Sequence, residues 1–202
     1  GGTPGAPNSV FNRSDSTGPI LKAYSFLDSV TLKLEFSEPL QNIAVGQFEL
    51  NPDLVINSAV NDPTLNNIVT LILNQEPDRG FGYKLKWQNI SDCLGNLISD
   101  SLTVALGKQP TYQELIITEI MADPSPSVGL PESEYIEIYN RTNYYISTND
   151  LKITEGGVSR SFGDFIFNSA SYLILVSGSA VENYPDTIQR IPMGFSLTNS
   201  GE

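Results

Sequence analysis

The sequence predicts an all-β protein made of two β-sandwich units in series. Short apolar segments with a period of two residues recur along the chain, as they do in half-buried strands. Turn-forming Gly, Pro, Asn and Asp residues interrupt them about every ten residues, and no long helical pattern appears. With 202 residues the chain is long enough for one large domain or two small ones.

The first unit is expected over residues 20–108, after a Gly- and Pro-rich segment at 1–19. Its clearest strand covers residues 30–36, where apolar and polar side chains alternate. Residues 83–87 alternate in the same way, which places Tyr83, Leu85 and Trp87 on one face and two lysines on the other. This is the pattern of a core strand. The alternative is a platform for stacking sugar rings, which Tyr24 would join.

A tight turn is expected where Asp92 precedes Asn96. An Asp side chain accepts hydrogen bonds from backbone groups two residues on, which explains the pair without any function. Cys93 lies in the same turn. We interpret it as an inert small residue, and the alternatives are a bond between chains or a reactive thiol.

The second unit is expected over residues 112–202. Strands are predicted at 115–121, 135–139 and 172–176, and the last is apolar enough to be buried on both faces. The sequence ends at Glu202 on a polar turn. We therefore expect the second sandwich to lack its last strand and to expose an edge that pairs with another chain.

The second unit resembles a lamin tail domain of the bacterial kind. The resemblance rests on Ile117–Pro124 (I-T-E-I-M-A-D-P), then Glu134–Asn140 (E-Y-I-E-I-Y-N), then 166–176, and finally Leu197–Glu202 (L-T-N-S-G-E), in the family's order. Such domains are immunoglobulin-like β-sandwiches that normally continue by another strand or two. Residues 2–9 are similar to the closing phrase of this family, so 1–19 is either the tail of a preceding copy or an unrelated linker.

The first unit resembles the bacterial immunoglobulin-like domain first described in S-layer proteins. This resemblance rests on the sequence F-S-E-P-L at Phe36–Leu40, the segment at 82–85, and the turn D-C-L-G-N at Asp92–Asn96. The two resemblances imply two immunoglobulin-like domains in series, and neither family implies catalysis.

Composition excludes several classes of protein. Eleven Lys and Arg against 23 Asp and Glu give a net charge of −12, which argues against a nucleic-acid groove or a polybasic membrane surface. There is no His, which removes Ser-His-Asp and Cys-His catalysis and His-containing zinc sites. One Cys excludes an intrachain disulfide. No apolar run approaches about 18 residues, so membrane insertion is not expected.

Carboxylates of the second unit are the candidate metal ligands. Glu119, Glu134 and Glu137 could hold Ca²⁺ if the fold brings them together, with Asn140 or Asp123 adding oxygens. Two of them could alternatively form the acid and base of a glycosidase. The third reading is that they are solvated strand residues or cap loop amides. No other cofactor is expected.

Tyr144 and Tyr145 are the candidate ligand-contact residues. They break the alternation just after a turn, so one of the two side chains is expected to face outward. The outward side chain is a candidate for contact with a ligand, and the alternative is an ordinary surface residue, since single exposed apolar side chains are common.

The sequence therefore favours a non-catalytic structural or interaction module of a larger exported or cell-surface bacterial protein, serving spacing, presentation or adhesion. The alternative is a module that binds carbohydrate or another ligand, with or without Ca²⁺, and a remote alternative is a hydrolase using two carboxylates. A protein or a surface glycan is the expected partner. The oligomeric state is not predicted beyond pairing at an edge strand.

Overall fold

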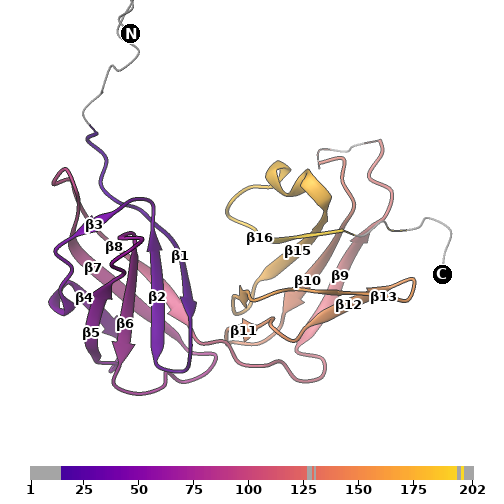
Figure 1. The fold of residues 1–202 in the computed structure, drawn as a ribbon. Helices are drawn as coiled ribbons and strands as arrows, with labels where there is room; N and C mark the ends of the chain where they lie inside the picture. The colour runs from indigo at the N-terminus through magenta and orange to yellow at the C-terminus, as the bar shows by residue number, and fades with distance from the viewer. Residues whose placement is uncertain (1–14, 127–128, 130, 195–196, 198–202) are drawn as a thin grey trace, which may run out of the picture. The chain divides into compact units, whose positions relative to one another are not determined.

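The computed structural model describes residues 15–126, 129, 131–194 and 197, and that part of the chain is almost entirely β-structure (Figure 1). Its regular elements are strands and two short 3₁₀ segments. The predicted all-β class is therefore confirmed. None of the described elements is a helix with the length and hydrophobicity needed to cross a bilayer.

The chain forms two compact units that interleave in sequence. One contains Gly1–Glu76 and Lys84–Thr103, and the other contains Pro77–Tyr83 and Val104–Glu202. The short segment at 77–83 thus belongs to the second unit, although it connects two strands of the first.

The first unit has two antiparallel sheets (Figure 1). One has the order β1-β2-β6-β5, formed by Leu21–Phe26, Thr31–Phe36, Ile68–Leu73 and Ile56–Asn61. The other has the order β3-β7-β4, formed by Leu40–Gln41, Gly82–Asp92 and Phe48–Asn51, with β8 (Leu97–Ala105) also paired to β7. The 3₁₀ segment η1 (Val45–Gln47) precedes β4.

The core of the first unit follows the predicted alternation. In β2 the side chains of Leu32, Leu34 and Phe36 are buried, whereas the residues between them are only half-buried. In β7 Leu85 and Trp87 are buried, and Trp87 meets Phe36 edge to face at 6.3 Å between ring centroids. Tyr83, which lies in the part of β7 that belongs to the second unit, is buried as well, so the core pattern predicted for Tyr83, Leu85 and Trp87 is confirmed.

The second unit is built on a sheet with the order β16-β15-β10-β9 (Figure 1). Its strands are Gln189–Met193, Tyr172–Ser177, Tyr135–Asn140 and Leu115–Met121. Two small antiparallel ribbons pair β11 (Ile146–Ser147) with β14 (Ile166–Phe167) and β12 (Lys152–Glu155) with β13 (Val158–Ser161). The 3₁₀ segment η2 (Gly178–Asn183) follows β15.

Strand β15 is covered on both faces, as its continuous apolar sequence predicts. Leu173 and Leu175 belong to a core cluster with Phe167 and other side chains, while Ile174 and Val176 pack on the opposite face in a second cluster that includes Tyr135 and Tyr184. Because each face has its own apolar cover, no polar residue is needed within the strand.

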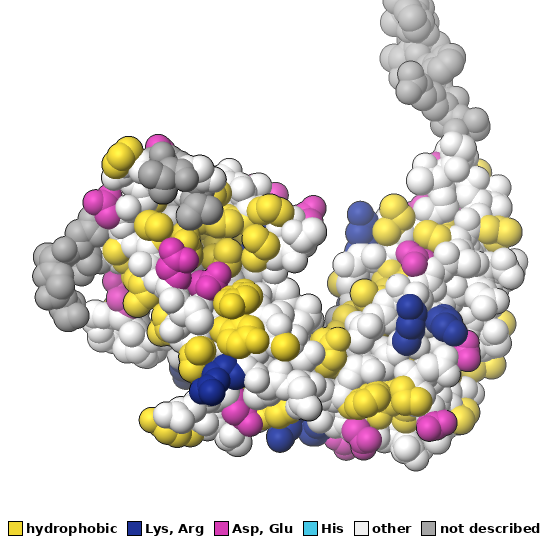
Figure 2. Space-filling model, turned by 180° about the vertical axis from the view of Figure 1, so that it is seen from behind, with side chains coloured by type: hydrophobic (Ala, Val, Ile, Leu, Met, Phe, Trp, Pro, Cys, Tyr) yellow, Lys and Arg dark blue, Asp and Glu magenta, His cyan; other side chains and the backbone are white. Residues whose placement is uncertain are grey.

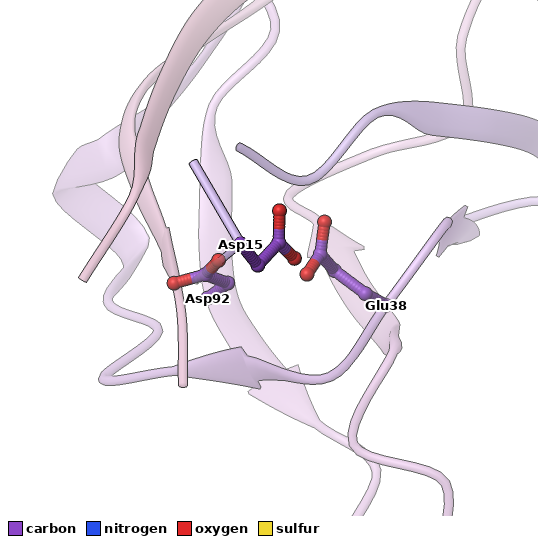
Figure 3. A group of neighbouring side chains, drawn as sticks. All are labelled: Asp15, Glu38 and Asp92. Carbon is purple, nitrogen blue, oxygen red and sulfur yellow. The ribbon is translucent and has the colours of Figure 1, made fainter. Parts of the chain in front are cut away.

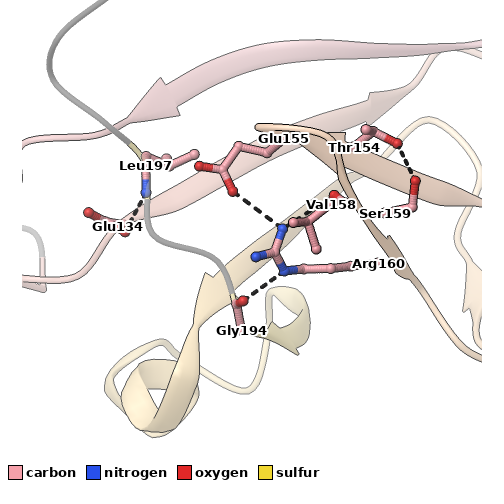
Figure 4. Close-up of polar contacts among 8 residues, drawn as sticks. All are labelled: Glu134, Thr154, Glu155, Val158, Ser159, Arg160, Gly194 and Leu197. Carbon is pink, nitrogen blue, oxygen red and sulfur yellow. Dashed lines mark hydrogen bonds and ion pairs between the residues drawn. The ribbon is translucent and has the colours of Figure 1, made fainter. Parts of the chain in front are cut away.

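After β16, two hydrogen bonds hold the chain against other parts of the second unit (Figure 4). The Gly194 carbonyl oxygen accepts a hydrogen bond from Arg160 Nε at 2.7 Å, and the Leu197 N–H donates to Glu134 Oε2 at 2.9 Å. Leu197 also packs against the core. Residues 198–202 and the segment at 1–14 lie outside the described residues, so the missing last strand and the tail of a preceding copy remain predictions.

Candidate functional site

Glu119 and Glu137 lie directly opposite each other on β9 and β10. Glu137 Oε1 accepts a hydrogen bond from Thr118 Oγ1 at 2.6 Å. Glu119 accepts a hydrogen bond from the Tyr135 hydroxyl. The pKa of Tyr135 is raised above its ordinary value, mainly because the hydroxyl is buried and secondly because it makes this bond. The two carboxylates thus form an adjacent acidic pair that neighbouring hydroxyls hold in place.

Glu134, the third predicted ligand, is directed elsewhere, because its carboxylate accepts the backbone N–H of Leu197. Among the described residues, the group of three acidic side chains close enough to share a cation contains none of Glu119, Glu134 and Glu137. Two carboxylates supply fewer oxygens than the about six to eight that Ca²⁺ takes. The predicted Ca²⁺ site therefore stays a prediction, with only the acidic pair brought together.

Asn140, the fourth predicted ligand, is fully buried and serves its own turn. Its Nδ2 donates to the carbonyl oxygens of Tyr144 at 3.0 Å and Asn168 at 2.8 Å. Its Oδ1 accepts from the N–H of Thr142 at 3.0 Å and from the Thr142 hydroxyl at 2.7 Å. Each polar atom of the side chain thus has an intramolecular partner.

Tyr144 and Tyr145 are both half-buried rather than one facing out. The Tyr144 ring packs against the core, and Lys108 Nζ lies 4.3 Å from its centroid. Burial, together with the neighbouring Glu114 carboxylate, raises the pKa of Tyr144 to about 12. These contacts are a structural role for Tyr144, and the ligand-contact role remains a prediction.

A different aromatic pair, Tyr139 and Tyr172, lies on strands β10 and β15 of the four-stranded sheet of the second unit. The rings of Tyr139 and Tyr172 are 4.6 Å apart at an angle of 34°, and Tyr172 is half exposed. Sequence reasoning missed this pair. The alternation along β10, which places Tyr139 on the same face as Glu137, was the signal that could have found it.

The first unit contains a group of three acidic residues, Asp15, Glu38 and Asp92 (Figure 3). One carboxylate oxygen from each lies within 4.8 Å of the others. Burial and the charges of Asp15 and Asp92 raise the pKa of Glu38. Carboxylate oxygens are the ligands that hard cations prefer, but the three residues repel one another when no cation is present.

Asp92 is at the same time the anchor of its turn. Its carboxylate accepts the backbone N–H groups of Leu94 and Asn96, each at 2.8 Å, and the side-chain amide of Asn96 at 2.7 Å. Burial opposes ionisation, but these hydrogen bonds outweigh it and lower the pKa of Asp92. The turn predicted from Asp92 and Asn96 is confirmed. Cys93, in the same turn, is exposed.

An apolar groove of about 350 Å³ lies beside the edge strands β4 and β5 of the first unit. It is shallow and open, and only Glu49 among its lining residues is charged. The groove is lined by Val45, Gly46, Phe48, Glu49, Leu50, Leu54, Val55 and Ile56.

The distribution of charged side chains at the surface agrees with the excess of acidic over basic residues in the sequence. On the face drawn in Figure 2, the acidic side chains among the residues coloured by type are scattered, and the Lys and Arg side chains form no broad patch. This distribution gives no electrostatic footprint for nucleic acid on that face.

No protein family and no curated protein matches the sequence. Three solved structures of the bacterial surface layer protein SbsC are similar to the chain. The structure of SbsC domains 1–6 has 12% sequence identity to this chain and a TM-score of 0.40, and the match covers 77% of this chain. The structure of the N-terminal part of SbsC has 13% sequence identity and a TM-score of 0.39, over 73% of this chain. The structure of rSbsC(31-844) has 10% identity and a TM-score of 0.42, over 79% of this chain.

The chain spans 20%, 38% and 32% of the length of those three structures. Likeness at this level does not establish a shared function. The resemblances to the lamin tail domain and to the bacterial immunoglobulin-like domain thus remain predictions.

Proposed function

We propose that the chain is a non-catalytic structural or interaction module of a larger exported bacterial protein, acting in spacing, presentation or adhesion. The observation that carries this proposal is the use made of the buried polar side chains. Four such side chains, Asp92, Ser133, Asn140 and Thr148, each make hydrogen bonds that hold a turn or loop. Among the described residues, the buried Trp87 Nε1 has no such partner.

The bonds of Thr148 and Ser133 show the same pattern as those of Asp92 and Asn140. Thr148 Oγ1 donates to the carbonyl oxygens of Gly163 or Phe165, at 2.9 and 3.0 Å. Ser133 Oγ and the Tyr184 hydroxyl are 3.0 Å apart. Buried polar groups bonded in this way make loops rigid, which suits a module that holds other parts of a protein at a fixed spacing.

A hydrolase using two carboxylates is the alternative that the acidic pair leaves to be tested. Glu119 and Glu137 are directly opposed on neighbouring strands, and both already accept hydrogen bonds from neighbouring hydroxyls. A glycosidase needs one carboxyl protonated as the general acid and room for the sugar between the two. The composition, without His and poor in charged residues, also favours a structural module of the cell exterior over an enzyme.

Hydrogen exchange measured by mass spectrometry, combined with a polysaccharide hydrolysis assay, tests this proposal. We expect the loop segments at 140–145 and 163–168 to exchange as slowly as their flanking strands, and no sugar release. The Glu137→Gln variant and the exposed control Glu182→Gln should behave like the parent chain. Sugar release that Glu137→Gln abolishes without loss of the fold would overturn the proposal.

A further inference from the structure

Strand β9 lies at the edge of the four-stranded sheet of the second unit. Among the described residues it pairs with β10 alone. An edge strand presents unpaired N–H and C=O groups that a further extended chain can join. With seven residues, Leu115–Met121, it offers a pairing surface as long as an ordinary strand.

One face of β9 carries two exposed isoleucines. Ile117 lies opposite Ile138 and Ile120 lies opposite Ile136, and directly opposed residues of an antiparallel pair share a face. Ile136 and Ile138 are buried in the core, whereas Ile117 is 55% exposed and Ile120 is 57% exposed. The apolar side of the sheet therefore continues to its edge, where the described residues leave these two side chains more than half exposed.

The other face of β9 is acidic. Glu119 is exposed there and lies opposite Glu137, and like charges that face each other across a strand pair are destabilising. Neither carboxylate forms an ion pair with a residue that the structure describes. A cation placed beside Glu119 would relieve this repulsion.

We propose that the edge of β9 binds an extended polypeptide segment that alternates apolar and basic residues. Its backbone adds a strand to β9, its apolar side chains cover Ile117 and Ile120, and a Lys or Arg faces Glu119. In this mode main-chain hydrogen bonds supply affinity and alternate side chains supply specificity. The inference rests on the proposed role as an interaction module and specifies the partner of one surface.

The local irregularity of β9 supports a selective partner over indiscriminate pairing. The register of the β9–β10 pair shifts between Glu137 and Ile138, which leaves Thr118 as the extra residue of a bulge. Bulges and charges at an edge discourage chance pairing with any exposed strand. A second copy of β9 is a poor partner, because it brings another exposed glutamate from a chain of net charge −12.

Fluorescence anisotropy with a labelled synthetic peptide tests the proposal on the whole chain. The probe has about six residues that alternate lysine and valine, the usual length of a strand. Two comparison peptides replace lysine by glutamate or valine by serine. In about 0.15 M salt, where attraction between distant charges is screened, we expect the lysine–valine peptide to bind about tenfold or more tightly than either.

Variants and hydrogen exchange locate the binding. Glu119→Lys should weaken the lysine–valine peptide about tenfold and strengthen the glutamate–valine peptide, while the control Glu182→Gln leaves both unchanged. Ile120→Ser should weaken both. Added peptide should slow amide exchange in residues 115–121. Equal binding of all three peptides, absence of binding, or protection elsewhere in the chain would overturn the proposal.

Sedimentation of the chain without peptide tests whether a second copy of the chain occupies this edge. A dimer that Ile120→Ser dissociates would assign the edge to a second copy and overturn the basic partner. If the folded chain has no hydrolytic activity and does not bind the peptide, only the proposed partner is wrong. If the chain has hydrolytic activity, the proposed function is wrong. The two failures are therefore distinguishable.

Discussion

Asn140 donates a hydrogen bond from its side-chain amide to the carbonyl oxygen of Asn168, which lies 28 residues later in the chain, at 2.8 Å. The same amide group also donates to the carbonyl oxygen of Tyr144. One buried side chain thus ties the turn after β10 to the segment before β15. The backbone bond from the Ala170 N–H to the Thr142 carbonyl oxygen, at 2.9 Å, joins the same two loops. Because the Asn140 side chain bonds to both loops, its loss affects both.

Replacement of the anchor in Asn140→Ala should destabilise the chain by about 3 kcal/mol, because the hydrogen bonds that this buried side chain makes to Thr142, Tyr144 and Asn168 are lost. Urea unfolding followed by circular dichroism measures the change. The neighbouring exposed Asn143 is the matched control, and Asn143→Ala should stay within about 0.5 kcal/mol of the parent. Equal stability of the two variants would contradict the anchor role.

A second prediction concerns Gly107, which passes close to the backbone of Ser147. A Cβ atom at Gly107 would lie 2.5 Å from Ser147 N and 2.8 Å from Ser147 Cα, so the backbone would have to move. Gly107→Ala should therefore cost about 2 kcal/mol or more in urea unfolding. Gly194→Ala is the control, since a Cβ placed at Gly194 would have no atom of the described residues within 4 Å. A gain in stability for Gly107→Ala would show that this close approach is wrong.

The sequence predicts those elements whose pattern is local. The alternation of Tyr83, Leu85 and Trp87 with lysines needs only the two-residue period of a strand, and the structure buries all three residues. The turn at Asp92 depends on contacts two to four residues away, and it was also predictable. Local hydrogen bonding and side-chain period are readable without knowledge of the sheet order.

The candidate sites depend on contacts that no local pattern carries. Asp15, Glu38 and Asp92 meet only because segments far apart in sequence meet in the folded unit. Strict alternation places Ile117 and Ile120 on opposite faces, whereas the bulge at Thr118 puts both on one face. Asn140 is a predicted metal ligand, but its Oδ1 accepts the N–H of Thr142 two residues later, and this Asx turn is a local pattern.

A third prediction concerns the pH dependence that Asp92 contributes. Its folded-state pKa is lowered, so its stabilising effect is present above its ordinary pKa near 3.8 and is lost as pH falls through the lower folded value. Asp92→Ala should therefore be less stable than the parent at pH 7, and the difference should shrink as the pH falls below about 3.8. Urea unfolding at pH 7 and pH 3 measures both values.

The exposed Asp164 is the control for this experiment. Asp164→Ala should match the parent chain at both pH values, since the side chain is at the surface. A destabilisation in Asp92→Ala that is as large at pH 3 as at pH 7 would mean that the carboxylate charge contributes nothing to the turn.

The last prediction concerns Glu38, whose pKa shift has the opposite sign. Burial and the charges of Asp15 and Asp92 raise its folded-state pKa, so ionised Glu38 opposes folding. The parent chain loses stability as pH rises from the ordinary pKa of 4.5 through the raised value, and the loss persists at neutral pH. Glu38→Gln should thus be more stable than the parent at pH 7, by about 0.5 kcal/mol on the scale of exposed charge pairs.

Urea unfolding at pH 7 and pH 3.5, in EDTA and in millimolar Ca²⁺, measures the effect of Glu38→Gln. In EDTA the gain at pH 7 should disappear at pH 3.5, because Glu38 is then protonated in both the folded and unfolded chain. A loss of stability in EDTA would contradict repulsion among the three carboxylates. If the parent gains stability from Ca²⁺ and Glu38→Gln does not, the three carboxylates bind the cation, and the predicted Ca²⁺ role belongs to the first unit instead of the second.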